Sequence, residues 1–282
     1  MEHEYNIYID YGEEINSRKF FESVSSFVIS IDNLNNALAH WFGSDIETEI
    51  FITKIEGGSI KVWMRDTLKK LPDDKIRDYT KNPMAMLGDF LVVAKYKIIE
   101  HTNKTPESFN EKVVEIIENE IKKLPELEAY GYQPNKIETL KAVGNLSRSA
   151  KMLPKPPVFQ TGTNELPVSS DYEFNIEEIE DIIKQTQTTR QTFIIKKPDM
   201  IGDSKWSIIF GKSIDVSIRD QEFKDKIKNR ELSISHGDML DAELIIETYL
   251  DNHMKVVETN YTIDKVYDII PPNTNLQGDL FT

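Results

Sequence analysis

Thr192-Phe193-Ile194-Ile195-Lys196-Lys197 is the stretch where apolar residues change from the spacing of three and four typical of helices to the spacing of two typical of strands. It opens a series of short alternating segments, separated by turns rich in Gly, Asp and Asn. The strand candidates are 192–197, 205–210, 213–218, 232–235, 242–250, 254–259 and 261–267, with one short helix at 220–228. This density of short strands predicts a small antiparallel β-barrel or sandwich over residues 191–270.

The first part of the chain has a different pattern, in which strands and helices alternate. The expected elements are a strand at 5–9, a helix at 18–41 and two strands at 48–56 and 59–68. Asn16 can cap the helix, and Gly57-Gly58 can form the turn of a hairpin because glycine accepts positive φ. Further helices are expected at 84–100, 106–124 and 136–152. The chain is therefore predicted to be α+β, and residues 1–152 are predicted to form an α+β domain.

Two segments lack a clear core pattern. Residues 153–190 contain several prolines among polar residues, which predicts a linker. Within it the acidic stretch 171–181 has isoleucines spaced for a short amphipathic helix. Residues 271–282 begin with two consecutive prolines and are expected to form a flexible tail.

The composition predicts a folded, acidic protein without cysteine chemistry. Of the 282 residues, 39% are hydrophobic and 29% are charged, which supplies enough apolar material for a core. Because there is no Cys, disulfides and Cys-ligated metal sites are excluded. The formal net charge of −14 would repel phosphate backbones, so we expect no broad nucleic-acid surface. The chain shows no signal-peptide pattern and no apolar run that could span a bilayer, so we expect a cytoplasmic protein without a membrane partner.

Histidines and carboxylates offer two places where chemistry could occur. His236 could act as a base oriented by Asp238, or His236-Gly237-Asp238 could be an ordinary turn, and the turn is the preferred interpretation. Two groups of carboxylates could hold magnesium, or could be outward-facing acids of an acidic protein; they are Asp215, Asp220 and Glu222, and Asp238, Asp241 and Glu243. The His pairs typical of zinc sites and the glycine-rich motifs that bind phosphate are absent. We expect no catalytic residue, no metal and no cofactor.

Residues 277–282, Gln-Gly-Asp-Leu-Phe-Thr, carry the most specific functional pattern. They resemble the Gln-x-Asp/Ser-Leu-Phe peptide by which many bacterial replication and repair proteins bind the DNA sliding clamp. The resemblance implies that Leu280 and Phe281 fill an apolar pocket of the clamp, while Gln277 and Asp279 fix the path of the peptide. The alternative is that Leu280 and Phe281 fold back onto an apolar patch of their own domain.

Other short motifs resemble parts of uncharacterised bacterial proteins from mobile islands and defence loci. They are Lys205-Trp206, Ile218-Arg219-Asp220-x-x-Phe223, His236-Gly237-Asp238 and Glu56-Gly57-Gly58-Ser59-Ile60. This resemblance implies a context and no site residues. We therefore expect a non-enzymatic adaptor or sensor of a phage-defence or mobile-element system, tethered to the sliding clamp by its tail and acting with other protein subunits. The alternatives are a metal-dependent nuclease and a scaffold subunit of a multi-protein defence complex.

Overall fold

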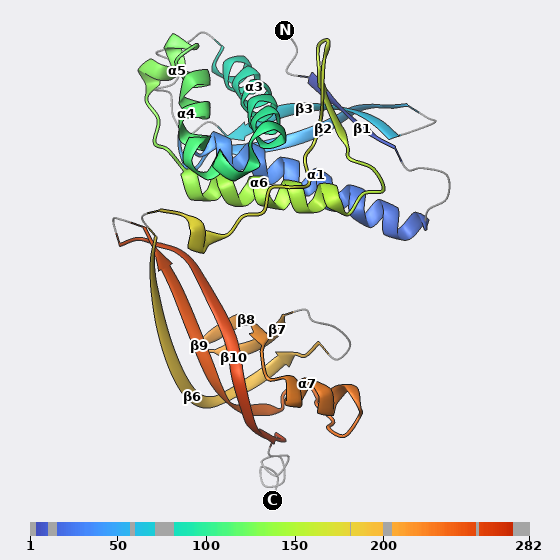
Figure 1. The fold of residues 1–282 in the computed structure, drawn as a ribbon, viewed down its shortest axis with the longest axis vertical. Coiled ribbons are helices and arrows are strands. Elements are labelled where there is room, and N and C mark those ends of the chain that lie inside the picture. Colours follow the sequence, from blue (N-terminus) through green and yellow to red (C-terminus); the bar gives the residue numbers. More distant parts are fainter. Residues whose placement is uncertain are drawn as a thin grey trace, which may run out of the picture. The chain divides into compact units, whose positions relative to one another are not determined.

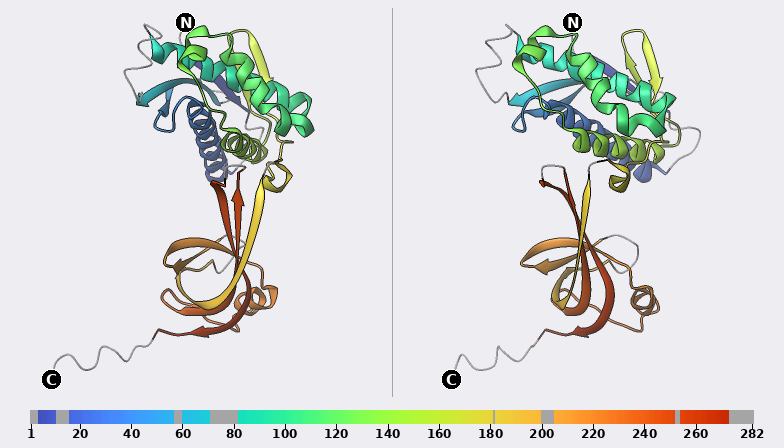
Figure 2. Two further views of the ribbon diagram at one scale, coloured as in Figure 1. Left: turned by 90° about the vertical axis from the view of Figure 1, so that its left-hand side faces the viewer. Right: turned by 60° about the vertical axis from the view of Figure 1, so that its left-hand side comes forward.

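The chain is an α+β protein that divides into two compact units, Met1–Asn175 and Ile176–Thr282. The computed structural model describes residues 4–10, 16–56, 60–70, 82–180, 182–199, 205–251 and 254–272. Figure 1 labels most of the helices and strands of both units, and Figure 2 gives two turned views. The predicted fold class is confirmed, because strands and helices make up the first unit and a closed barrel forms the second.

A five-stranded antiparallel sheet with the strand order β2-β3-β1-β4-β5 supports the first unit. Its strands are β1 (Glu4–Ile9), β2 (Glu47–Glu56), β3 (Ile60–Lys70), β4 (Val158–Thr161) and β5 (Asn164–Pro167). β1 is central, and its alternate residues Tyr5, Ile7 and Ile9 are fully buried. The predicted strands at 5–9, 48–56 and 59–68 are confirmed, while the turn at Gly57-Gly58 lies outside the described residues.

Helices cover this sheet and complete the core of the first unit. They are α1 (Ser17–Ala39), α3 (Pro83–Lys104), α4 (Phe109–Ile121), α5 (Pro125–Tyr130) and α6 (Lys136–Lys151), with a short 3₁₀ turn η1 (Pro106–Ser108) before α4. The predicted cap of α1 is confirmed, because Asn16 Oδ1 accepts a hydrogen bond from the Lys19 backbone N–H at 3.1 Å. α1 and α6 run side by side (Figures 1 and 2), and apolar residues of α1 such as Phe27 and Leu34 are fully buried.

The predicted linker at 153–190 is not a linker over most of its length. β4 and β5 form a hairpin within it, and β4 pairs with β1 through Ile7 and Phe159, both buried. Pro154, Pro156 and Pro157 precede β4, and Pro167 is the last residue of the edge strand β5, positions at which a proline is tolerated in a sheet. The predicted amphipathic helix at 171–181 is limited to one 3₁₀ turn, η2 (Ile176–Glu178). The acidic side chains are exposed, so little packing energy is available to extend that turn into a helix.

The second unit is a closed five-stranded barrel with the order β10-β8-β7-β6-β9. Its elements are β6 (Ile183–Lys197), β7 (Trp206–Phe210), β8 (Lys212–Ile218), α7 (Gln221–Lys228), β9 (Met239–Leu250) and β10 (Val256–Ile270). Inward side chains, including Phe193, Trp206 and Leu240, fill the barrel. Four strand pairs are antiparallel and one, β10 with β8, is parallel. A parallel pair is possible there because α7 and β9 lie between β8 and β10 in the chain.

Long strands distinguish this barrel from the seven short strands expected. β6, β9 and β10 pass well beyond the shorter β7 and β8 (Figures 1 and 2). β6 begins nine residues before the expected 192, and the expected strands 254–259 and 261–267 are one strand, β10. The expected strand at 232–235 is not a strand in the structure. The early part of β6 is exposed and largely polar on both faces, so it does not form a strand because of a buried face. It is a strand because it pairs with β9.

Every described helix is too short or too polar to cross a membrane.

Candidate functional site

The residues with the strongest functional pattern in the sequence, Gln277, Asp279, Leu280 and Phe281, lie outside the described residues. The sliding-clamp interpretation therefore stays a prediction. The described part of the second unit offers a different site, which sequence reasoning did not find.

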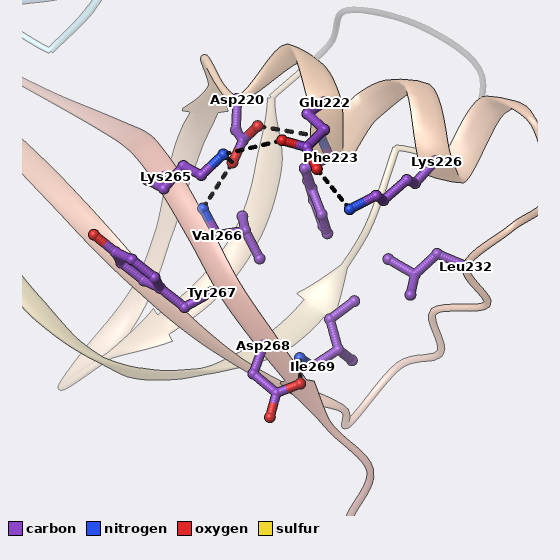
Figure 3. A pocket seen from close by; sticks show the side chains of 10 residues that line it. All are labelled: Asp220, Glu222, Phe223, Lys226, Leu232, Lys265, Val266, Tyr267, Asp268 and Ile269. Carbon is purple, nitrogen blue, oxygen red and sulfur yellow. Dashed lines mark hydrogen bonds and ion pairs between the residues drawn. The ribbon is translucent and has the colours of Figure 1, made fainter.

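A pocket of about 140 Å³ opens between α7 and β10 in the second unit (Figure 3). Its apolar lining consists of Phe223, Leu232, Val266 and Ile269, all of which also pack against the barrel core. A cavity of about 150 Å³ lined by apolar side chains is large enough for benzene. This pocket therefore has the size of one aromatic or branched aliphatic side chain.

Asp220 joins the two walls of the pocket. Its Oδ1 caps α7 by accepting from the Phe223 N–H at 3.1 Å, and its Oδ2 accepts from the Val266 N–H of β10 at 3.0 Å. Lys265 Nζ lies 3.3 Å from the same Oδ2 (Figure 3). Burial of Asp220 opposes ionisation, but the two N–H donors and the Lys265 ammonium outweigh it and lower the pKa of the carboxyl. Asp220 thus links α7 to β10, in addition to Phe223 and Ile227 of α7, which pack into the barrel core.

The rim of the pocket carries charges that neutralise one another. Glu222 lies 2.7 Å from Lys226 Nζ and 3.5 Å from Lys265 Nζ, and Figure 3 shows these groups along one side of the opening. The hydrogen bond from Lys226 lowers the pKa of Glu222, and the hydrogen bond to Asp220, with a smaller contribution from Glu222, raises the pKa of Lys265. An apolar floor with a paired, charged rim can bind an apolar side chain of a peptide, and it presents no activated nucleophile or base.

The structure brings together only some members of the two sets of acidic residues that the sequence analysis considered as magnesium ligands. Asp220 and Glu222 meet at the pocket, where lysines pair with them. Asp241 is held by Arg190, whose guanidinium donates twice to it at 3.2 and 2.8 Å and stacks on the Tyr267 ring. Within the described residues, no group of three or more His, Asp or Glu side chains is arranged to hold a metal ion.

His236-Gly237-Asp238 forms a turn, as the preferred interpretation predicted. Gly237 adopts a φ of +93°, and Asp238 Oδ2 accepts from the Ser235 N–H at 2.7 Å. His236 Nδ1 lies 2.6 Å from the Lys196 carbonyl oxygen. The ring of His236 therefore contacts the backbone of β6, and Asp238 is engaged in the turn itself.

A buried lysine in the first unit was also not found in the sequence. Lys95 of α3 is 1% exposed, and its Nζ donates to Asn35 Oδ1 at 2.5 Å and lies 4.2 Å from the centroid of the Tyr5 ring. A neutral amide and an aromatic face are both suitable neighbours for an ammonium group. Nothing in a single Lys within an apolar helical segment marks it as buried, since lysines in such segments usually face water.

Comparisons with known proteins add no relative: no protein-family model, no curated protein and no solved structure matches the chain. The resemblance to proteins of defence loci stays a prediction.

Proposed function

We propose that this protein is a non-enzymatic bacterial adaptor of the cytoplasm that residues 277–282 tether to the DNA sliding clamp. The observation that carries the proposal is the sequence Gln277-Gly278-Asp279-Leu280-Phe281. It follows β10, the last strand of the barrel, after two prolines that cannot continue the ladder.

Two apolar side chains at the end of a short peptide suit a tether. Burying Leu280 and Phe281 would contribute about 1.5–3 kcal/mol each before the cost of ordering the peptide. Gln277 would add hydrogen bonds that fix the register of the peptide. Together these terms correspond to a Kd on the order of 10 μM to 1 mM, which holds a protein near a partner without fixing it there.

The pocket between α7 and β10 supports an adaptor because it gives the barrel a second place to bind protein. It accepts one apolar side chain, and its lining residues belong to the barrel core. The motifs similar to proteins of mobile islands and defence loci support a role in such a system, with further subunits as partners.

Binding of the full chain to a purified bacterial sliding clamp, measured by isothermal titration calorimetry, tests the proposal. The variant Leu280→Ala/Phe281→Ala should weaken binding at least 50-fold, because both anchors are lost. The matched control Asn273→Ala/Asn275→Ala changes two residues of the same segment outside the motif and should bind within twofold of the unmodified chain. If the unmodified chain does not bind, or if the Leu280→Ala/Phe281→Ala variant binds equally well, the proposed function is wrong.

A further inference from the structure

Four apolar residues form a continuous row across the outer face of the barrel. Strand register places Ile270 of β10 beside Met239 of β9, Met239 beside Ile194 of β6, and Ile194 beside Ile209 of β7. On each strand one adjacent residue packs in or against the barrel core (Phe193, Ile208, Leu240 and Ile269), so these four side chains point outward. We name Ile194, Ile209, Met239 and Ile270 the outer row.

The outer row is exposed to a degree that is unusual for aliphatic side chains on adjoining strands. Ile194 is 42%, Ile209 41% and Ile270 37% exposed, while Met239 is half-buried. Isolated exposed aliphatic residues are ordinary, but a contiguous set is typical of a surface that binds another segment.

Lysines border the row at its β8 end. Ile209 pairs with Ser213 of β8, and Lys196 Nζ donates to Ser213 Oγ at 3.3 Å. Lys197, which pairs with Ser207 of β7, is exposed on the same face, and so is the acid Asp215, which pairs with Ser207 from β8. Asp241 and Asp268, a cross-strand pair two residues from Met239 and Ile270, border the row on the same face, so the border carries both signs of charge and the row itself selects for apolar side chains.

We infer that the outer row is the docking surface for the chain's own residues 276–281. This segment contains Leu276, Leu280 and Phe281 with one acid, Asp279, and the ten residues 273–282 include no base. It therefore carries three apolar side chains with which to cover the apolar row.

The position of the row at the end of β10 favours this occupant over a separate partner. Ile270 is both a member of the row and the last residue of β10. Leu280 is ten residues further on, a distance that an extended chain can span up to about 35 Å. The row crosses four strands, or about 14 Å at ordinary strand spacing. An attached segment also has an effective concentration in the millimolar range, so weak contacts are enough to hold it.

Docking on the row would make the same residues unavailable to the clamp, a consequence that rests on the proposed function. Leu280 and Phe281 cannot fill a clamp pocket while they cover Ile194 and Ile209. The apparent clamp affinity falls by the fraction of chains whose segment is free. The row would therefore act as an internal competitor for the tether.

Disulfide trapping in the full chain tests the docking without the clamp, since the chain has no Cys of its own. The pair Thr282→Cys and Ser213→Cys should close under mild oxidation, and adding Ile194→Thr/Ile209→Thr should slow closure at least fivefold. Thr keeps the β-branched shape of Ile, so the strands are retained. The matched control Ile183→Thr/Val256→Thr changes two exposed apolar residues of the same barrel, at the other ends of β6 and β10, and should leave the rate unchanged.

Three results would overturn the inference. Closure could be equally fast with and without the row substitutions, which would mean that the segment does not use the row. Closure could be faster when the second Cys replaces Lys226, which would place the segment at the α7–β10 pocket. The disulfides could form between molecules in proportion to concentration, which would make a second copy the occupant.

Clamp binding then separates this inference from the proposed function. The Ile194→Thr/Ile209→Thr variant should bind the clamp on the order of 3- to 10-fold more tightly than the unmodified chain. If no version of the chain binds the clamp but trapping depends on the row, the proposed function fails and the docking stands. If clamp binding is unaffected and trapping ignores the row, the docking fails and the proposed function stands.

Discussion

Replacing Asp220 by Ala should destabilise the barrel more than any loss of a surface charge would. Asp220 is 4% exposed at its side chain and accepts from two backbone N–H groups, those of Phe223 and Val266. Loss of a helix cap costs about 1 kcal/mol. An unsatisfied N–H of Val266 costs about 1–3 kcal/mol. The ion pair with the solvent-exposed Lys265 adds little to this, so the expected loss for Asp220→Ala is about 2–4 kcal/mol.

Two companion variants separate these contributions. Asp220→Asn keeps an oxygen that can cap α7, but it turns an amide group toward the Val266 N–H, so we expect a loss of about 1–3 kcal/mol. Glu222→Ala removes only exposed ion pairs from the first turn of α7 and should cost less stability than either Asp220 variant. The loss of stability should therefore be largest for Asp220→Ala, smaller for Asp220→Asn and smallest for Glu222→Ala, because the three variants remove progressively fewer buried hydrogen bonds.

Hydrogen exchange measured by mass spectrometry at increasing urea concentration reports the free energy of opening of each unit separately. Peptides from β7 and β8 report the opening of the barrel. Peptides from α1 provide the internal control, because α1 belongs to the other compact unit. The reasoning is refuted if Asp220→Ala lowers the free energy of opening of the barrel by less than about 1 kcal/mol. It is also refuted if Glu222→Ala lowers it equally.

Two further predictions concern the first unit. Lys97 and Lys104 donate to Glu100 and lower its pKa from 4.5 to about 2, so the stabilisation is complete above pH 4.5 and is lost as the pH falls toward 2. Thermal unfolding measured from pH 7 to 2 should show that Glu100→Gln is about 1 kcal/mol less stable than the unmodified chain at pH 7. The difference should shrink toward pH 2. A difference that stays constant with pH would contradict this prediction. Gly144→Ala would place a Cβ 2.5 Å from Phe174 Cβ, which is too close for an unstrained contact. The substitution also gains helix propensity of up to about 1 kcal/mol. We expect the strain to be the larger effect, so that the free energy of unfolding measured in urea falls by about 1–2 kcal/mol. A raised urea midpoint would contradict this prediction, because it would mean that Phe174 can move away from the new methyl group at little cost.

Much of the fold could be predicted from local pattern. The helix α1 was predicted within two residues at each end because its apolar stripe and the Asn16 cap are signals that neighbouring residues carry alone. The predicted barrel region was also confirmed, because alternation and turn residues mark its core strands. The early part of β6 was not predicted, since Gln185 and Thr188 are exposed and no alternation marks them.

The pocket could not be predicted because it depends on partners distant in the chain. Asp220 reads locally as an ordinary cap of a short helix, and its bond to Val266 crosses 46 positions. The outer row has the same origin, since Ile194 and Ile270 become neighbours only through Met239 between them. Each of these residues, considered alone, is an ordinary aliphatic member of an alternating strand.

By itself, the sequence determined the long helices of the first unit and the core strands of the barrel, that Cys chemistry is excluded, and that residues 277–281 carry a clamp-like motif. These properties depend on side chains a few positions apart, whose spacing is set by the period of a helix or a strand. Only the tertiary structure decided that the segment at 158–167 completes the first sheet, that one carboxylate joins α7 to β10, and that four aliphatic side chains line up on the barrel. The physical reason is that register and closure are set by pairing between distant strands, and such pairing has no local signal.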